Sequence, residues 1–143
     1  MKRRLLLSAL LLLASCAPQG DPGIELSGAW ARPTLGQAPG AVYLTIDNKG
    51  GSDDRLIGAS TDQAAMAMVH QTELVDGVAR MRMANEINVP AGEQIKMVPG
   101  GTHLMLEGLR APLQVGDKFD LVLRFRRSGD KKVNVSVVEA DRQ

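Results

Sequence analysis

Histidine and methionine supply the side chains of this 143-residue chain whose types and spacing could bind a metal ion. The chain has two histidines, His70 and His103, and six methionines after the initiator. In His103-Leu104-Met105 the imidazole and the thioether are two residues apart, so a β-strand would project both from one face. Upstream, ten residues separate His70 from Met81.

These donors favour copper(I) over other metals. A thioether is a soft, neutral ligand, and together with neutral imidazole it suits copper(I). Zinc would call for cysteine or carboxylate beside histidine, and calcium for clustered oxygens. A blue-copper centre needs a cysteine thiolate, and the single cysteine, Cys16, lies near the N-terminus. The donor types therefore indicate copper(I) that is bound and does not cycle between redox states.

The same residues also have ordinary structural interpretations. A lone strand histidine can be a plain polar residue, and methionine often fills gaps in a core. We assign Met66 and Met97 to the core on this ground. Met68 and Met83 each lie two residues from a proposed ligand and could share its face, but we assign them to packing as well. Spacing alone leaves both interpretations of the four residues His70, Met81, His103 and Met105 open.

The N-terminus is typical of a secreted, lipid-anchored protein. Residues 1–15 combine a cationic start with an apolar run that is too short to span a bilayer, as in a signal peptide. The run ends in Leu13-Ala14-Ser15-Cys16, which resembles the lipobox of bacterial lipoproteins, so we predict lipidation of Cys16. A free thiol or an intermolecular disulfide is the alternative. Residues 16–25 would form a tether, and residues 26–140 the domain.

The predicted cleavage after residue 15 determines both the expected membrane location and the charge of the mature chain. Ala17 follows the cysteine, where aspartate is the familiar inner-membrane retention signal. In a Gram-negative cell we therefore expect the domain to face the periplasm from the outer membrane. Without residues 1–15 the chain has 14 basic and 16 acidic side chains. This balance disfavours a nucleic-acid binder, which needs a concentrated positive face.

Short alternating segments predict an all-β fold. Residues 41–46 include β-branched and aromatic side chains. In residues 119–125 Phe or Leu occupies every second position, and in residues 133–137 valine alternates with polar residues. Leu104 and Leu106 would point into the core. A short strand is expected at 93–98 and one helical turn at Thr61–Ala65. The spacing fits a β-sandwich or Greek-key barrel of roughly seven to nine strands.

A longer pattern resembles the PCuAC family of periplasmic copper chaperones. The family pattern is a histidine or methionine, ten residues, a methionine, twenty-one residues and His-x-Met. His70, Met81, His103 and Met105 match every position of it. Three flanking segments also resemble the family: Ala29-Trp30-Ala31-Arg32, Val89-Pro90-Ala91-Gly92 and Leu106-Glu107-Gly108-Leu109. Many relatives carry a further methionine where this chain has Glu107, which shares the parity of His103 and Met105.

The resemblance implies a cupredoxin-like Greek-key β-sandwich that holds copper(I) with these four side chains. It further implies delivery of the ion towards the copper centre of cytochrome c oxidase, through subunit II or a thiol-bearing assembly factor. Two rivals remain: a copper-sequestering or resistance lipoprotein, and a lipid-anchored interaction module without metal. An enzyme is not expected, because no nucleophile motif such as G-x-S-x-G accompanies the two histidines.

Overall fold

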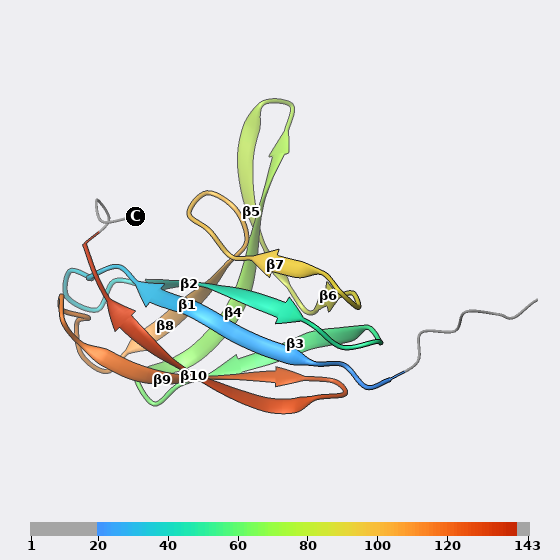
Figure 1. Ribbon diagram of the computed structural model, residues 1–143. Helices are drawn as coiled ribbons and strands as arrows, with labels where there is room; N and C mark the ends of the chain where they lie inside the picture. Colours follow the sequence, from blue (N-terminus) through green and yellow to red (C-terminus); the bar gives the residue numbers. More distant parts are fainter. Residues whose placement is uncertain (1–19, 140–143) are drawn as a thin grey trace, which may run out of the picture.

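A computed structural model describes residues 20–139, and every regular element in that range is a β-strand (Figure 1). The strands are β1 (Ile24–Ala31), β2 (Gly40–Asn48), β3 (Asp54–Ser60), β4 (Ala64–Val75), β5 (Val78–Ala84), β6 (Ile87–Val89), β7 (Gln94–Lys96), β8 (His103–Leu109), β9 (Lys118–Phe125) and β10 (Gly129–Val137). The predicted all-β class is therefore confirmed. The predicted signal peptide and Cys16 lie outside the described residues. Within those residues, no helix has the length and apolar character needed to cross a membrane.

The strands form one sheet that curls back on itself. Its order is β5-β4-β8-β2-β1-β10-β9-β3-β6, with β7 paired to β2. β1 and β10 run parallel, and the other pairs are antiparallel. A further pairing of β3 with β4, through Ala59 and Ala67, joins the two strands that lie next to the ends of this path. The result is a barrel-like or sandwich-like layer around one apolar core.

Period-two alternation fills the core as the sequence predicts. On β9, Phe119, Leu121, Leu123 and Phe125 are buried while Asp120 and Arg124 are exposed. On β8, Leu104 and Leu106 are fully buried. Because successive strand residues face opposite sides, the inward leucines of β8 oblige His103 and Met105 to face outward.

Two expectations about the elements of the fold are corrected. The described chain has ten strands, more than the seven to nine expected. Thr61–Ala65 is not helical: Asp62 and Gln63 form a turn and β4 begins at Ala64. The Thr61 hydroxyl explains this turn, because it donates to the Asp120 carbonyl (2.8 Å) and accepts from the Gln63 N–H (3.3 Å).

The domain also begins earlier than expected. β1 starts at Ile24, which is buried, so residues 24 and 25 belong to the sheet and not to a tether. Gly23 is fixed as well, since its N–H donates to the Asn48 side chain (3.0 Å) and its carbonyl accepts from the Lys49 N–H (2.9 Å). The glycine and proline content of this segment concealed these contacts, which come from a distant loop.

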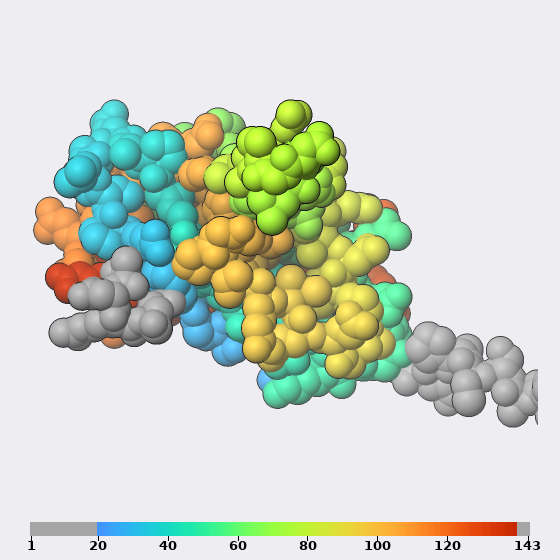
Figure 2. Space-filling view, turned by 90° about the horizontal axis from the view of Figure 1, so that it is seen from above, coloured from blue at the N-terminus to red at the C-terminus, as the bar shows by residue number. Residues whose placement is uncertain are grey.

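A long hairpin formed by the end of β4 and by β5 rises from the body of the sheet (Figure 1). Its turn, Asp76-Gly77, has positive φ at both residues (53° and 78°), the conformation of a tight two-residue hairpin turn. Viewed from above, the hairpin tip is a raised yellow-green knob beside the gold segment that precedes β8 (Figure 2). His70 on β4 and His103 at the start of β8 lie where this hairpin leaves the sheet.

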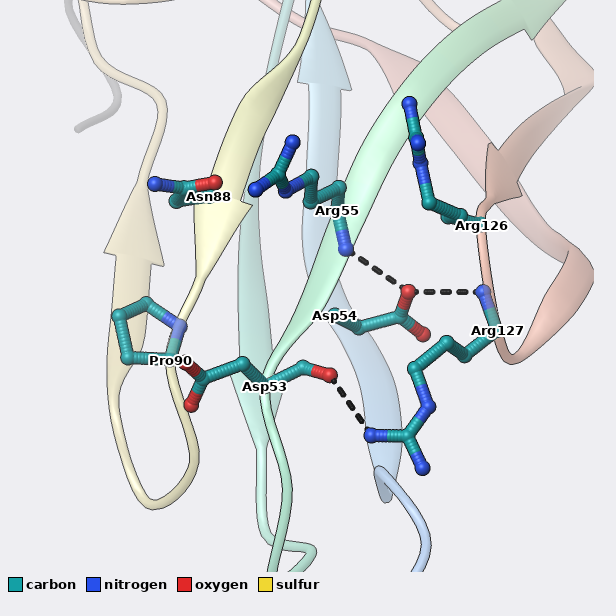
Figure 3. Close-up of a pocket in the computed structure, with 7 residues that line it drawn as sticks. All are labelled: Asp53, Asp54, Arg55, Asn88, Pro90, Arg126 and Arg127. Atoms are coloured by element: carbon teal, nitrogen blue, oxygen red, sulfur yellow. Dashed lines mark hydrogen bonds between the residues drawn. The ribbon is translucent and has the colours of Figure 1, made fainter.

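At another place on the sheet, a buried carboxylate holds the β9–β10 turn (Figure 3). Asp54 is 2% exposed and accepts hydrogen bonds from the N–H groups of Arg55 (2.7 Å), Arg127 (2.9 Å) and Ser128 (2.9 Å) and from the Ser128 hydroxyl (2.6 Å). Burial by itself raises the pKa of Asp54, but these hydrogen bonds together outweigh it and hold the pKa below its usual value.

We expect Asp54→Asn to lower the free energy of unfolding by about 2–3 kcal/mol at neutral pH, because an amide N–H₂ would face donors. The depressed pKa means that the ionised carboxylate stabilises the fold above about pH 4 and that this gain disappears as the pH falls through the folded-state pKa. The difference between the two proteins should therefore shrink below about pH 4 in urea unfolding. Asp53→Asn, at an exposed neighbour, is the control; a difference that stays constant with pH would contradict the assignment.

Candidate metal centre

Two histidines separated by 33 positions of sequence face each other across the sheet. The antiparallel register of β4 and β8 pairs His70 directly with His103. Their ring centroids are 5.9 Å apart, with the rings edge to face at 66°. Directly paired residues lie on the same face, so both imidazoles belong to the outer surface of the sheet. The folded chain thus brings together its two neutral nitrogen donors.

His103 is held with one nitrogen available. The residue is only 5% exposed, and its Nδ1 lies 3.0 Å from the carbonyl oxygen of Gly101. A carbonyl can only accept, so Nδ1 carries the proton and donates, which leaves the lone pair on Nε2. A ring fixed by a backbone carbonyl in this way is the usual arrangement of a metal-ligating histidine.

His70 has a buried nitrogen without a partner. Among residues 20–139, its Nδ1 is the buried side-chain nitrogen or oxygen that makes no hydrogen bond. Buried polar atoms are nearly always satisfied, and an exception calls for an explanation such as a bound ion. The half-buried His70 ring is therefore suited to bind a metal through this atom or to hold a water there.

Methionines surround the histidine pair on the same face. Met105 is two residues from His103, and it pairs directly with Met68 of β4. On the other side of β4, His70 pairs with Met83 of β5, and Thr72 pairs with Met81. His70, His103 and Met105 therefore share the outer face of β4 and β8. Met81 shares that face on β5 but lies two residues closer to the hairpin tip than Met83, which is the residue paired with His70. Met81 pairs with Thr72 and so with none of the other three proposed ligands.

Sequence reasoning misassigned two methionines. Met66 and Met83 are 53% and 57% exposed, so their assignment to core packing is wrong. Met68 is half-buried, and Met97, at 2% exposed, is the core residue that the sequence predicts. For Met66 the missed signal is parity, because it alternates in step with Met68 and His70; for Met83 the shared parity with Met81 is recognised in the sequence but given too little weight.

Aromatic residues close the side of the site towards β2. The Tyr43 ring centroid lies 6.2 Å from that of His103 and 4.4 Å from that of Trp30. The Arg32 guanidinium lies 5.9 Å from the centre of the Tyr43 ring. These groups explain how an outward-facing histidine can be buried: the Tyr43 ring of β2 lies beside it, and Trp30 of β1 packs on Tyr43. They limit access to the candidate metal site from that direction.

The resulting donor set is soft and neutral. Among residues 20–139, no three His, Cys, Asp or Glu side chains lie together as a possible metal site. The outer face of β4, β5 and β8 instead combines two imidazoles with five thioethers, those of Met66, Met68, Met81, Met83 and Met105. Glu107, which pairs with Met66, adds one carboxylate at the edge of this set. Such donors suit copper(I), which accepts three or four soft ligands.

Comparisons with known proteins agree with this architecture. The sequence model of the LpqE-like family, a family of lipoproteins by its description, matches residues 24–137. "Putative lipoprotein Lxx21020" of Leifsonia xyli subsp. xyli is 33% identical over 116 residues, which cover 80% of this chain and 69% of that protein.

Two solved structures have similar folds. The copper-bound PCuAC domain from PmoF2 superposes with a TM-score of 0.69 at 23% identity, over 81% of this chain and 92% of that domain. The solution structure of copper(I)-bound DR1885 from Deinococcus radiodurans gives a TM-score of 0.66 at 27% identity, over 90% and 86%. The resemblance to the PCuAC family predicted from the sequence is confirmed.

Proposed function

We propose that this chain, which belongs to the LpqE-like family, binds copper(I) through His70, Met81, His103 and Met105 and passes the ion to another protein. The observation that carries the proposal is the facing histidine pair. One ring has its lone pair set by Gly101, the other has a buried nitrogen without a partner in the described chain, and thioethers lie on both sides. Similar folds that bind copper, in PmoF2 and DR1885, support it.

Neutral ligands favour transfer over permanent storage. A site without thiolates holds copper(I) less firmly than one that contains them, and each imidazole or thioether can be exchanged for a donor of the acceptor. The step moves no electron, so no catalytic group is required. The acceptor we propose is the copper centre of cytochrome c oxidase, reached through subunit II or a thiol-bearing assembly factor. Transfer of copper(I) from the loaded protein to an apo-oxidase fragment tests delivery against sequestration.

The proposed location is the cell envelope. Lipidation of Cys16 after removal of residues 1–15 would tie the domain to a membrane on its extracytoplasmic side, and in a Gram-negative cell we propose the outer membrane. The lipoprotein name of the relative from Leifsonia xyli supports an anchor. Mass spectrometry of the N-terminal peptide from membranes would reveal the acyl chains, and an unmodified thiol would contradict the anchor.

Met105→Leu is expected to weaken copper(I) binding at least about tenfold, because it removes one soft ligand while conserving side-chain volume. The measurement is a copper(I) titration of untagged protein against a competing chelator. Met97→Leu is the matched control, since it also removes one thioether, but from the core. If both variants bind copper(I) as the parent does, Met105 is not a ligand.

A further inference from the structure

Below the histidine pair, the outer face of β4 and β8 continues as a ladder of possible ligands. Three successive cross-strand pairs make up this ladder: His70 with His103, Met68 with Met105, and Met66 with Glu107. Paired Cβ atoms in such a ladder are about 5 Å apart, and neighbouring pairs on one face are separated by about 7 Å along the strand. Flexible methionine side chains on neighbouring pairs can lean towards a common point, so Met66, Met68, Met105 and Glu107 form a group of three thioethers and one carboxylate, which we call the methionine block.

The methionine block is more open to solvent than the histidine pair. Met66 is 53% exposed, whereas His103 is 5% exposed. Met66 and Met68 both line a surface hollow of about 270 Å³ between the end of β3 and the start of β4. Met68 also lines a second hollow together with Met83. Core packing cannot explain a half-exposed methionine, and the hollows let a ligand or an acceptor approach Met66 and Met68.

The chemistry of the methionine block is that of a second soft site. Three thioethers are sufficient ligands for copper(I), and a nearby carboxylate attracts a cation. Met105 belongs both to this block and to the proposed site at the histidines. An ion could therefore release its two imidazoles and Met81 and take up the sulfur atoms of Met66 and Met68 while Met105 remains bound, passing from four ligands to three. Copper stays in the +1 state throughout, and neutral ligands replace neutral ligands, so neither electrons nor protons are released.

We propose that Met66, Met68 and Met105, with Glu107 at the edge, form a second copper(I) position through which the ion enters and leaves the histidine pair. This inference rests on the proposed function. Because Met105 serves both positions, one ion occupies one position at a time. The block is the side from which an acceptor's donors reach the metal.

The first test removes the histidines. In the full-length chain, the double variant His70→Leu, His103→Leu should retain one weakly bound copper(I) with an all-sulfur ligand shell in X-ray absorption. Adding Met66→Leu and Met68→Leu should lower the remaining affinity at least about tenfold, whereas adding Met97→Leu should not. The inference is overturned if the double variant binds no copper(I). It is also overturned if adding Met66→Leu and Met68→Leu lowers the copper(I) affinity no more than adding Met97→Leu does. Failure of the unmodified chain to bind copper(I) would instead reject the proposed function.

A second measurement decides the matter if the histidine-free chain does not fold. With both histidines present, Met66→Leu combined with Met68→Leu should slow the release of copper(I) to excess bathocuproine disulfonate at least about tenfold relative to Met97→Leu. Equal release rates in a stopped-flow experiment would overturn the inference.

Discussion

Replacing His70 or His103 by leucine is expected to lower the affinity for copper(I) at least about 100-fold. Loss of a group that only orients a metal ligand costs about 10- to 100-fold, so loss of an imidazole ligand should cost at least the upper value and more than loss of the weaker thioether donor of Met105. The two rings face each other 5.9 Å apart, and each has a nitrogen free to bind. Competition with a chelator of known copper(I) affinity measures the effect.

His70→Met is the matched control for His70→Leu. The two replacements have similar volume and differ mainly in the sulfur donor, so methionine should restore most of the affinity that leucine loses. His103→Leu needs a check of the fold by circular dichroism, because this ring packs beside Tyr43. Equal losses in His70→Met and His70→Leu would mean that His70 shapes the surface without binding the ion.

Asn48→Ala is expected to lower the free energy of unfolding by about 3–4 kcal/mol, because one side chain makes four hydrogen bonds to the backbone. Asn48 is fully buried, and its amide donates to the carbonyls of Ser52 (2.8 Å) and Val89 (3.0 Å). Its Oδ1 accepts from the N–H groups of Gly23 (3.0 Å) and Gly50 (3.1 Å). Alanine would leave the buried carbonyls of Ser52 and Val89 without these donors and the half-buried N–H groups of Gly23 and Gly50 without their acceptor. Urea unfolding measures the loss.

Asn134→Ala is the control for Asn48→Ala. The Asn134 side chain also donates to a carbonyl, that of Phe119 (3.4 Å), and to Asp120 (3.2 Å), but at an exposed position. Water can replace these partners, so the expected loss is below about 1 kcal/mol. A comparable loss of unfolding free energy in both variants would contradict this role. The Asn48 hydrogen bonds would then not hold the segment before β1, the loop after β2 and the end of β6 together.

The sequence predicts the core-forming parts of this fold well because they depend on local alternation. Phe119, Leu121 and Leu123 are identified as inward-facing by parity alone, and Leu104 with Leu106 likewise. The role of Asn48 could not be predicted, since its partners come from three separate segments. The turn at Asp62-Gln63 cannot be distinguished from a helical turn by sequence alone. It depends on the hydrogen bond from the Thr61 hydroxyl to the carbonyl of Asp120, a residue far away in the sequence.

Cross-strand register limits what the sequence can say about the candidate metal site. The sequence places His103 and Met105 on one face, but the pairing of His70 with His103 and of Met68 with Met105 appears only in the folded sheet. The exposure of Met66 follows from its place on an outer face, which composition alone does not reveal. The four predicted ligands came from a family pattern, and the surrounding thioethers came from the structure.

X-ray absorption at the copper edge of the copper(I)-loaded full-length chain tests the central claim most directly. Three or four ligands that include both imidazole nitrogen and thioether sulfur are the expected result, with sulfur scattering reduced in Met105→Leu and unchanged in Met97→Leu. A shell of nitrogen and oxygen alone, or sulfur scattering that Met105→Leu leaves unaltered, would contradict the convergence of these side chains on one copper(I) ion.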